Sequence, residues 1–376
     1  MTSAQMMTPL SQKQRRWFFN ALFIMFFCAV PVFIFYAAGY RLDIGKDETS
    51  IIGVGGIYLI TDGNHIDMFL DNEPIEDMRV FRSAAYMQNV EAGLHNIYTN
   101  GVGVQTWSKR LPVWPHIVTR VESFNLPKVP QVRLIPTYKT SENADIVTDE
   151  FNDLFDFAST INTNTVTLAS TTASSRLANP EYLYLSQRFA SSTEERLQVR
   201  EQVERFAERF TFESTSATTT LATTSKQYGD IYLREEDEEV YAGYLGQESK
   251  KPEYFCITYT TDVEVIRNYG EHVLDSLYKI YTDLDLLAEP TKLCRSEIKI
   301  DRLRQTVHYF DFVPGRENLV LLQLDDGLYV IEVDDRSWQN TQKLYGGVDI
   351  EVIVEGGNIY VHDRGYILEV MMELSQ

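Results

Sequence analysis

The feature that most constrains this chain is a run of 24 residues without a single charge, WFFNALFIMFFCAVPVFIFYAAGY, at positions 17–40. A helix over residues 17–39 rises roughly 34 Å, which is enough to cross a hydrocarbon core of about 30 Å. Trp17 at one end and Tyr36 and Tyr40 at the other fit the aromatic belts of membrane-spanning helices. The sequence therefore predicts a transmembrane anchor over residues 17–40 that contacts the lipid bilayer.

Charge on the two sides of this run sets the expected orientation. The first 16 residues carry Lys13, Arg15 and Arg16 and no acidic residue, whereas the whole chain has 34 Lys and Arg against 54 Asp and Glu and a net charge of -20. Basic flanks of membrane helices stay on the cytoplasmic side. We therefore expect a cytoplasmic tail at residues 1–16 and a single-pass protein of the cell membrane whose residues 41–376 are extracytoplasmic.

Two other interpretations of the apolar run remain open. A cleaved signal peptide has an apolar core of about 7–15 residues and a small-x-small cleavage site, whereas this run is longer and its end, FYAAGYRLD, fits that site poorly. A buried helix of a soluble protein is the other interpretation, although an uncharged run of this length is rarely one. The acidic excess excludes nucleic acid as an expected partner, because phosphates are bound by Lys and Arg.

The composition of the chain changes twice after the anchor. Residues 41–136 contain short strands with turn residues between them, which is typical of a small β-sandwich. Residues 137–227 are rich in Ser and Thr and predict a linker, with a helix over residues 192–210 that begins at Ser192 and Thr193. The narrow apolar stripe of that helix fits packing on the main body or, alternatively, docking to a partner.

Residues 228–376 return to strands, separated by turn sequences such as PGREN, Asp326-Gly327 and Gly356-Gly357. Strand-turn-strand units at this spacing are typical of β-propeller blades. About two to three such units are present, whereas propellers have at least about four blades. We therefore predict a partial propeller, or one closed by strands from elsewhere in the chain. The predicted fold class is mainly β, with one transmembrane helix, a β-sandwich, a Ser/Thr-rich segment with a helix, and a propeller-like domain.

The segment EAGLHNIYTNGVGVQTWSKRLPV at residues 91–113 predicts a β-hairpin that closes the sandwich. Asn100-Gly101 between two apolar-patterned pieces is a strong signal for a hairpin turn. Trp107 is interpreted as a core residue of this hairpin or, alternatively, as an exposed ring that stacks on a sugar.

The pattern over residues 55–121 resembles the PEGA domain, a small β-sandwich repeat of bacterial surface proteins. The segment LDNEP stands where that family has a tight turn, and Gly93, Tyr98, Gly101 and Trp107 occupy marked positions of its closing strands. The Pro-Glu-Gly-Ala stretch that names the family is absent, and DGNH stands in its place. Together with the anchor and the propeller-like region, the resemblance implies a membrane-anchored bacterial surface protein and implies no activity.

The three cysteines differ in their expected surroundings. Cys28 lies in the anchor and is interpreted as a small apolar residue. Cys256 and Cys294 lie in the region predicted to be outside the cytoplasm, where a disulfide can form. Two separate buried thiols are the alternative. The sequence has no C-x-x-C, which excludes zinc-ribbon and thioredoxin motifs.

Motifs that carry chemistry are absent from the sequence. The six histidines are scattered, and H-E-x-x-H, G-x-S-x-G, a Walker lysine and a dinucleotide fingerprint are missing. GVGG at residues 53–56 is interpreted as a flexible entry to a strand. Acidic turns such as REEDEE at residues 234–239 offer oxygens that calcium prefers, but no EF-hand loop accompanies them. We predict no catalytic residue, no cofactor and no metal site.

These observations favour a non-catalytic binding or scaffolding protein of the cell envelope, with a protein or an envelope polymer as its partner. The alternative is an envelope hydrolase whose site is built from loops of the β domain and leaves no linear motif. Two or three of His272, His308, Asp311 and His362 meeting in one cleft would favour that enzyme. A sensor that signals inward is a third interpretation, weakened by the short cytoplasmic tail.

Overall fold

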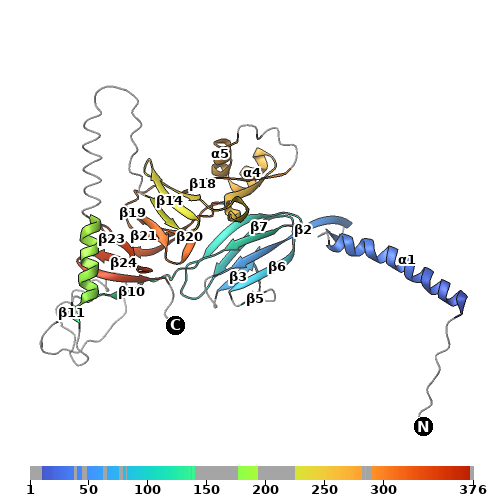
Figure 1. The fold of residues 1–376 in the computed structure, drawn as a ribbon, viewed down its shortest axis with the longest axis horizontal. Coiled ribbons are helices and arrows are strands. Elements are labelled where there is room, and N and C mark those ends of the chain that lie inside the picture. Colours follow the sequence, from blue (N-terminus) through green and yellow to red (C-terminus); the bar gives the residue numbers. More distant parts are fainter. Residues whose placement is uncertain are drawn as a thin grey trace, which may run out of the picture. The chain divides into compact units, whose positions relative to one another are not determined.

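The fold is known from a computed structural model (Figure 1). It describes residues 11–372 apart from 38–39, 45–48, 62–65, 76–78, 82, 137, 140–176, 194–224, 282–283 and 285–289. The turn predicted from DGNH, most of the Ser/Thr-rich segment and the predicted helix beyond Thr193 lie outside the described residues. The chain is mainly β with one long N-terminal helix, which confirms those two parts of the predicted fold class.

The chain divides into two compact units. Unit 1 is Met1–Asn125, Ile257–Leu293 and Arg336–Trp338, and unit 2 is Leu126–Cys256, Cys294–Asp335 and Gln339–Gln376. Each unit therefore contains pieces that are far apart in the sequence.

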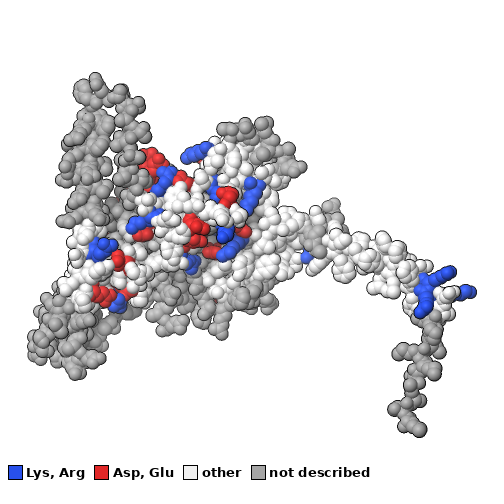
Figure 2. Space-filling model, viewed as in Figure 1, with Lys and Arg blue, Asp and Glu red and all other residues white. Residues whose placement is uncertain are grey.

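The N-terminal helix α1 (Gln12–Ala37) is the one helix in the described part of the chain that is long and apolar enough to cross a membrane. It begins at a capping box, because the Gln14 N–H donates to Ser11 Oγ at 3.4 Å and Gln14 Oε1 accepts from the Ser11 N–H at 3.1 Å. Its apolar side chains are exposed along the whole length, and Figure 2 shows them as a white surface with basic residues at the N-terminal end. An apolar surface exposed all round suits lipid as its surroundings.

Unit 1 contains two larger sheets in addition to most of the short pair β16 (Cys256–Tyr259) and β17 (Thr291–Cys294). One has the order β1-β2-β6-β5, with β9 added parallel to β2, and the other has the order β4-β3-β7-β8. All other strand pairs in these two sheets are antiparallel. The strands are β1 (Tyr40–Ile44), β2 (Thr49–Ile60), β3 (Asp67–Leu70), β4 (Glu73–Pro74), β5 (Arg79–Phe81), β6 (Ala84–Glu91), β7 (Gly93–Asn100), β8 (Trp107–Val113) and β9 (Val118–Glu122).

The predicted hairpin of residues 91–113 is present as β7 and β8, which pair from Gly93 opposite Val113 to Thr99 opposite Trp107. Its turn differs from the prediction, because β7 continues through Asn100 and residues 101–106 connect the strands. The Thr106 hydroxyl donates to the Asn100 side chain at 3.2 Å across the base of this longer loop. Asn100-Gly101 thus marks the end of a strand rather than a two-residue turn.

Unit 1 also includes two short helices, α4 (Asp262–Tyr269) and α5 (Glu271–Tyr278). Thr261 caps α4 by accepting from the Glu264 N–H, and Gly270, with a φ of 108°, separates the helices. Their inner faces form a small core with the adjoining strand residues: Ile257, Tyr259, Val265, Tyr269, Val273, Leu274, Leu277, Leu284 and Leu293.

Unit 2 contains three four-stranded antiparallel sheets, with the orders β13-β14-β15-β18, β19-β20-β21-β22 and β10-β25-β24-β23. Most neighbours in a sheet are consecutive in the sequence. The exceptions are β10, which pairs with the last strand, and β18, which pairs with β15 although β16 and β17 lie between them in the sequence. The strands are β10 (Gln131–Leu134), β13 (Ser225–Tyr228), β14 (Ile231–Glu236), β15 (Glu239–Tyr244), β18 (Glu297–Ile300), β19 (Tyr309–Val313), β20 (Arg316–Leu324), β21 (Gly327–Glu332), β22 (Thr341–Gly346), β23 (Glu351–Glu355), β24 (Asn358–Asp363) and β25 (Tyr366–Met371).

Smaller elements complete the described part of the chain. Two short strands, β11 (Tyr138–Lys139) and β12 (Leu177–Ala178), pair with each other, as do β16 (Cys256–Tyr259) and β17 (Thr291–Cys294). The 3-10 helices η1 (Glu248–Lys250) and η2 (Glu253–Phe255) precede β16.

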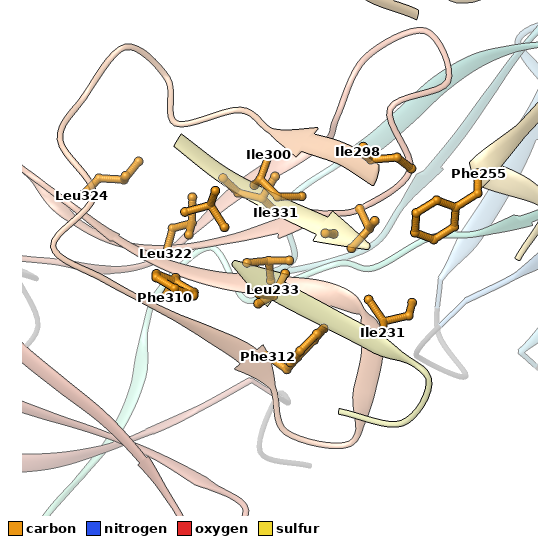
Figure 3. Close-up of a cluster of buried hydrophobic side chains, with 14 of the residues drawn as sticks. Ile231, Leu233, Phe255, Ile298, Ile300, Phe310, Phe312, Leu322, Leu324 and Ile331 are labelled. Carbon is orange, nitrogen blue, oxygen red and sulfur yellow. The ribbon is translucent and has the colours of Figure 1, made fainter. Parts of the chain in front are cut away.

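An aliphatic and aromatic core joins the first two sheets of unit 2 (Figure 3). Side chains reach this core because alternate residues of a strand point to the same face, as Ile231 and Leu233 of β14 do. Burial of each such side chain contributes about 1.5–3 kcal/mol relative to exposure. The labelled members are Ile231, Leu233, Phe255, Ile298, Ile300, Phe310, Phe312, Leu322, Leu324 and Ile331.

The helix in the Ser/Thr-rich segment begins well before the predicted start at Ser192. Residues 180–193 are helical, with Asn179 as the cap, whose side chain accepts from the Glu181 N–H at 3.1 Å. Proline at the first helical position is compatible with this start because its missing N–H has no partner there. Leu185 and Phe189 pack on Ile353, Tyr360 and Ile367 of the third sheet. The described part of this helix is therefore packed on its own unit.

Candidate functional site

The point where the chain leaves α1 is organised around Arg41. Its guanidinium donates to the carbonyl oxygens of Tyr36 and Tyr40 at 2.8 and 2.9 Å and lies 3.5 Å from the centre of the Tyr36 ring. Carbonyls at the end of a helix lack intrahelical partners, and a cation there is favoured by the helix dipole. Arg41 therefore terminates α1 and stabilises the turn into β1.

Arg41 also joins the helix end to the first sheet of unit 1. Its second amine donates to the side chain of Asn89. Asn89 is the extra residue of a bulge in β6, since Gly55 pairs with Val90 and Gly56 pairs with Gln88, and its φ is 60°. The bulge turns this amide towards Arg41, so the link depends on tertiary structure rather than on a sequence motif.

The glycines of GVGG lie in the middle of β2, where the connection between β8 and β9 crosses the strand. A Cβ on Gly55 would lie 2.7 Å from Val113 Cγ1 and 2.8 Å from the Ile117 carbonyl oxygen, and it would clash with the Trp114 carbonyl. The interpretation of these residues as a flexible entry is therefore wrong. They are small because another segment of backbone passes directly over them.

Cys256 and Cys294 are joined by a disulfide, with their Cα atoms 4.0 Å apart. They are the last residue of unit 2 before the segment Ile257–Leu293 and the first residue after it. The segment that contains α4 and α5 therefore begins and ends at one covalently closed point. Cys28 is a free, exposed thiol on α1.

Arg295, the residue after Cys294, forms a buried ion pair with Asp335. The Arg295 guanidinium donates to both carboxylate oxygens of Asp335 at 2.5 and 2.6 Å, and it also donates to the Tyr254 carbonyl at 3.1 Å. Both side chains are almost completely inaccessible to water. A bidentate geometry of this kind is a strong form of carboxylate recognition. The pair links a residue between β17 and β18 to the last residue of unit 2 before Arg336–Trp338.

The residues named for a possible enzyme have separate partners. His308 pairs with Asp325 at 2.8 Å, His362 pairs with Glu351 at 3.1 Å, and Asp311 accepts from Lys226 at 3.0 Å. His272, the fourth candidate, lies on α5 in unit 1. Among the residues that the structure describes, no three His, Cys, Asp or Glu side chains are grouped as metal ligands.

In the acidic turn at residues 234–239, Glu236 and Glu239 form ion pairs with basic side chains. Arg234 donates to both carboxylate oxygens of Glu297 at 2.6 Å, and this hydrogen bonding lowers the pKa of Glu297. Glu239 forms ion pairs with Lys299 at 3.0 Å and Arg302 at 3.2 Å. A carboxylate that already pairs with a basic side chain is poorly suited to bind calcium, which applies to Glu236 and Glu239 of this turn.

Trp107 is fully buried, with an exposed fraction of 0%. The alternation along β8 places Trp107, Lys109 and Leu111 on the buried side and Ser108 and Arg110 on the exposed side. A ring without an exposed face cannot stack on a ligand. The sugar-stacking interpretation is therefore wrong, and Trp107 is a core residue.

Sequence reasoning missed Arg41, although its position directly after an apolar run with aromatic ends is a usable signal. It also missed the close backbone approach at GVGG, for which a sequence gives no partner. Neither a protein-family model nor a curated protein or solved structure matches the chain.

Proposed function

We propose that the chain is a single-pass membrane protein of the bacterial cell envelope whose residues 41–376 form a non-catalytic binding or scaffolding region outside the cytoplasm. The observation that carries this proposal is α1, whose apolar side chains are exposed over its length and whose end is joined by Arg41 to a sheet. A helix of this kind needs lipid around it.

The disulfide supports the proposed side of the membrane. Disulfides persist in oxidising compartments and are rare in the cytoplasm. The Cys256–Cys294 bond and the basic residues before α1 therefore favour the same orientation.

Two β-rich units connected to a membrane anchor are suited to present binding surfaces outside the membrane. We propose that the sheets of unit 1 form a PEGA-like sandwich and that unit 2 is a propeller-like domain with three blades. Support for the second assignment is the strand order. Three or more consecutive strands of each sheet form a meander, and β10 completes the sheet of the last three strands, as ring-closing strands do in propellers. The proposed partner is a protein or an envelope polymer.

Topology is the first test. Protease is added to intact spheroplasts that contain the full chain with tags at both ends. We expect loss of the C-terminal tag and protection of the N-terminal tag, with a cytoplasmic marker intact as the control. Protection of the C-terminal tag until lysis would overturn the orientation, and a mature chain that lacks α1 would show a cleaved signal peptide.

The second test asks whether the protein binds an envelope polymer or catalyses a reaction. The purified full chain in detergent is sedimented with isolated cell-wall polymer and assayed with glycosidase, peptidase and esterase substrates. We expect saturable co-sedimentation and no turnover. Robust turnover that is lost on mutation of His308, Asp311 or His362 would replace the binding protein with an envelope hydrolase.

A further inference from the structure

An exposed apolar patch lies beside the end of α1. It consists of Tyr40, at the start of β1, of the half-buried Pro115 and the exposed Ile117 from the connection between β8 and β9, and of Val118, the first residue of β9. We propose that this juxtamembrane patch inserts into the headgroup region of the bilayer that α1 crosses, so that unit 1 contacts the membrane at a second point. The inference rests on the proposed function, because it requires α1 to span a membrane.

The exposure of the patch is the first observation. The exposed fraction is 51% for Ile117, 41% for Val118 and 39% for Tyr40. The loop WPHIV carries no acidic, Lys or Arg residue. Contiguous exposed apolar side chains are a feature of surfaces that bind a membrane or another protein.

The position of the patch identifies lipid as the cover. The Tyr40 ring stacks on Phe35 of α1 with 5.2 Å between the ring centres, and its other neighbour is His116, at 5.0 Å. Tyr40 pairs with Gly53, and Pro115 lies over that glycine. The patch is therefore one ring away from the last turns of the membrane helix, at the level where the chain leaves the bilayer.

The loop is held in place with its apolar side chains outward. The His116 N–H donates to the Val54 carbonyl and the Gly56 N–H donates to the Ile117 carbonyl, both at 3.0 Å. Trp114 Nε1 donates to the Tyr269 hydroxyl at 3.3 Å. His116 has a φ of 65°, which costs energy for a residue other than glycine. A strained and well-bonded turn that exposes Ile117 is typical of a functional surface.

The chemistry of the patch matches the membrane interface. Tyrosine and histidine rings and aliphatic side chains lie together at headgroup depth in interfacial segments, where the peptide groups still find water. Arg41 adds a cation at the end of α1, and Glu91, opposite Val54 in the sheet, is an acidic residue among the described neighbours of β2. A second contact of this kind would restrict rotation of unit 1 about the end of α1.

The test uses the full chain with its disulfide intact, in vesicles of phosphatidylethanolamine and phosphatidylglycerol. In a Cys28→Ser background, a single cysteine replaces Ile117, Val102 or Met25 and is labelled with an environment-sensitive fluorophore. Val102 is the matched control: it is 98% exposed, and it lies in the loop at the other end of β8, roughly 20 Å away. Met25 reports on α1 itself.

Lipid nitroxides at headgroup and acyl-chain depth are the probes. We expect headgroup nitroxide to quench the label at 117 several-fold more than the label at 102, and acyl-chain nitroxide to quench the label at 25. Equal weak quenching at 117 and 102, with strong quenching at 25, would overturn the membrane contact of the patch while supporting α1 as a membrane anchor. No quenching at 25 overturns the anchor and this inference together. Shielding of 117 from aqueous iodide without lipid quenching shows a protein cover instead, which also overturns the inference.

Discussion

Unit 1 and unit 2 are both built from strands, but different contacts complete them. Most sheet neighbours in unit 2 are consecutive strands, and a disulfide and a buried ion pair join residues at or next to the points where the chain leaves or re-enters this unit. Unit 1 relies on the parallel pairing of β9 with β2 and on backbone crossing at Gly53–Gly56. Its α4 and α5 come from a distant part of the sequence. The buried ion pair and the disulfide are specific side-chain contacts of unit 2, whereas unit 1 additionally needs small residues where one backbone segment passes close to another.

This difference indicates which substitutions are expected to destabilise each unit. In unit 2, a substitution in the ion pair leaves a buried charge without its counter-ion, and loss of the disulfide removes a covalent link. In unit 1, a Cβ added to Gly55 takes the space of the backbone that passes over β2. Local hydrogen exchange, measured by mass spectrometry on the full chain, separates the two units, because each substitution is expected to weaken protection in its own unit.

The largest effect is expected in unit 2 on removal of one partner of the buried ion pair. Asp335→Asn leaves the Arg295 charge buried without its counter-ion, which costs about 3–5 kcal/mol. The control is Asp326→Asn, since the Asp326–Lys343 pair is exposed and is worth about 1 kcal/mol or less. Loss of protection in unit 2 is measured for both variants. Equal small losses would show that the buried pair contributes no more than a surface pair.

The disulfide is expected to rank next. Replacing Cys256 and Cys294 together by Ser releases a loop with a sequence separation of 38, which costs roughly 3–4 kcal/mol in the chain-entropy account. Mass spectrometry of alkylated, non-reduced protein checks the bond itself, and hydrogen exchange measures the loss. Cys28→Ser is the control and should leave protection unchanged. Free thiols at 256 and 294 in the native protein would contradict the prediction.

A smaller effect is expected in unit 1 from Gly55→Ala. The new Cβ meets the backbone of residues 114–117, and overpacking of this kind costs about 1–3 kcal/mol. Gly93→Ala is matched to it, because a Cβ there has its nearest neighbour, His95 Nε2, at 4.0 Å. Protection of β2 and β9 should fall in the first variant and stay in the second. A fall in both would mean that glycine flexibility, and not space, matters.

The smallest effect is expected in the pH dependence of the stability of unit 2. Hydrogen bonds from Arg234 lower the pKa of Glu297 below 4.5, its ordinary value. A carboxylate with a lowered pKa stabilises the fold above its unfolded pKa, and that contribution disappears as the pH falls through the folded pKa. The difference in unfolding free energy between the native chain and Glu297→Gln should therefore be largest near neutrality and shrink below about pH 4. The exposed Glu73→Gln serves as control, and a difference that grows on acidification would contradict the assignment.

Much of the strand content was predictable because its signal is local. The apolar residues of β20 and β21 and the acidic pair between them indicate a hairpin without help from the rest of the chain. Its turn is Asp325-Asp326, one position before the predicted Asp326-Gly327, because Gly327 already pairs with Leu324. The apolar run of α1 has the same property, since length and absence of charge are read directly from the sequence. Cys256 and Cys294 were candidates for a bridge, but their spacing left separate thiols open.

The sequence by itself thus determined the apolar helix, the strands and the residue types available at the candidate sites. Tertiary structure alone decided that β10 completes the last sheet, that Trp107 is buried, that GVGG lies under a crossing loop and that each candidate histidine of unit 2 faces its own carboxylate. The physical reason is the range of the interactions. Periodicity and turn preference act over a few residues, whereas burial, close approach and charge pairing depend on which distant segments the folded chain brings together.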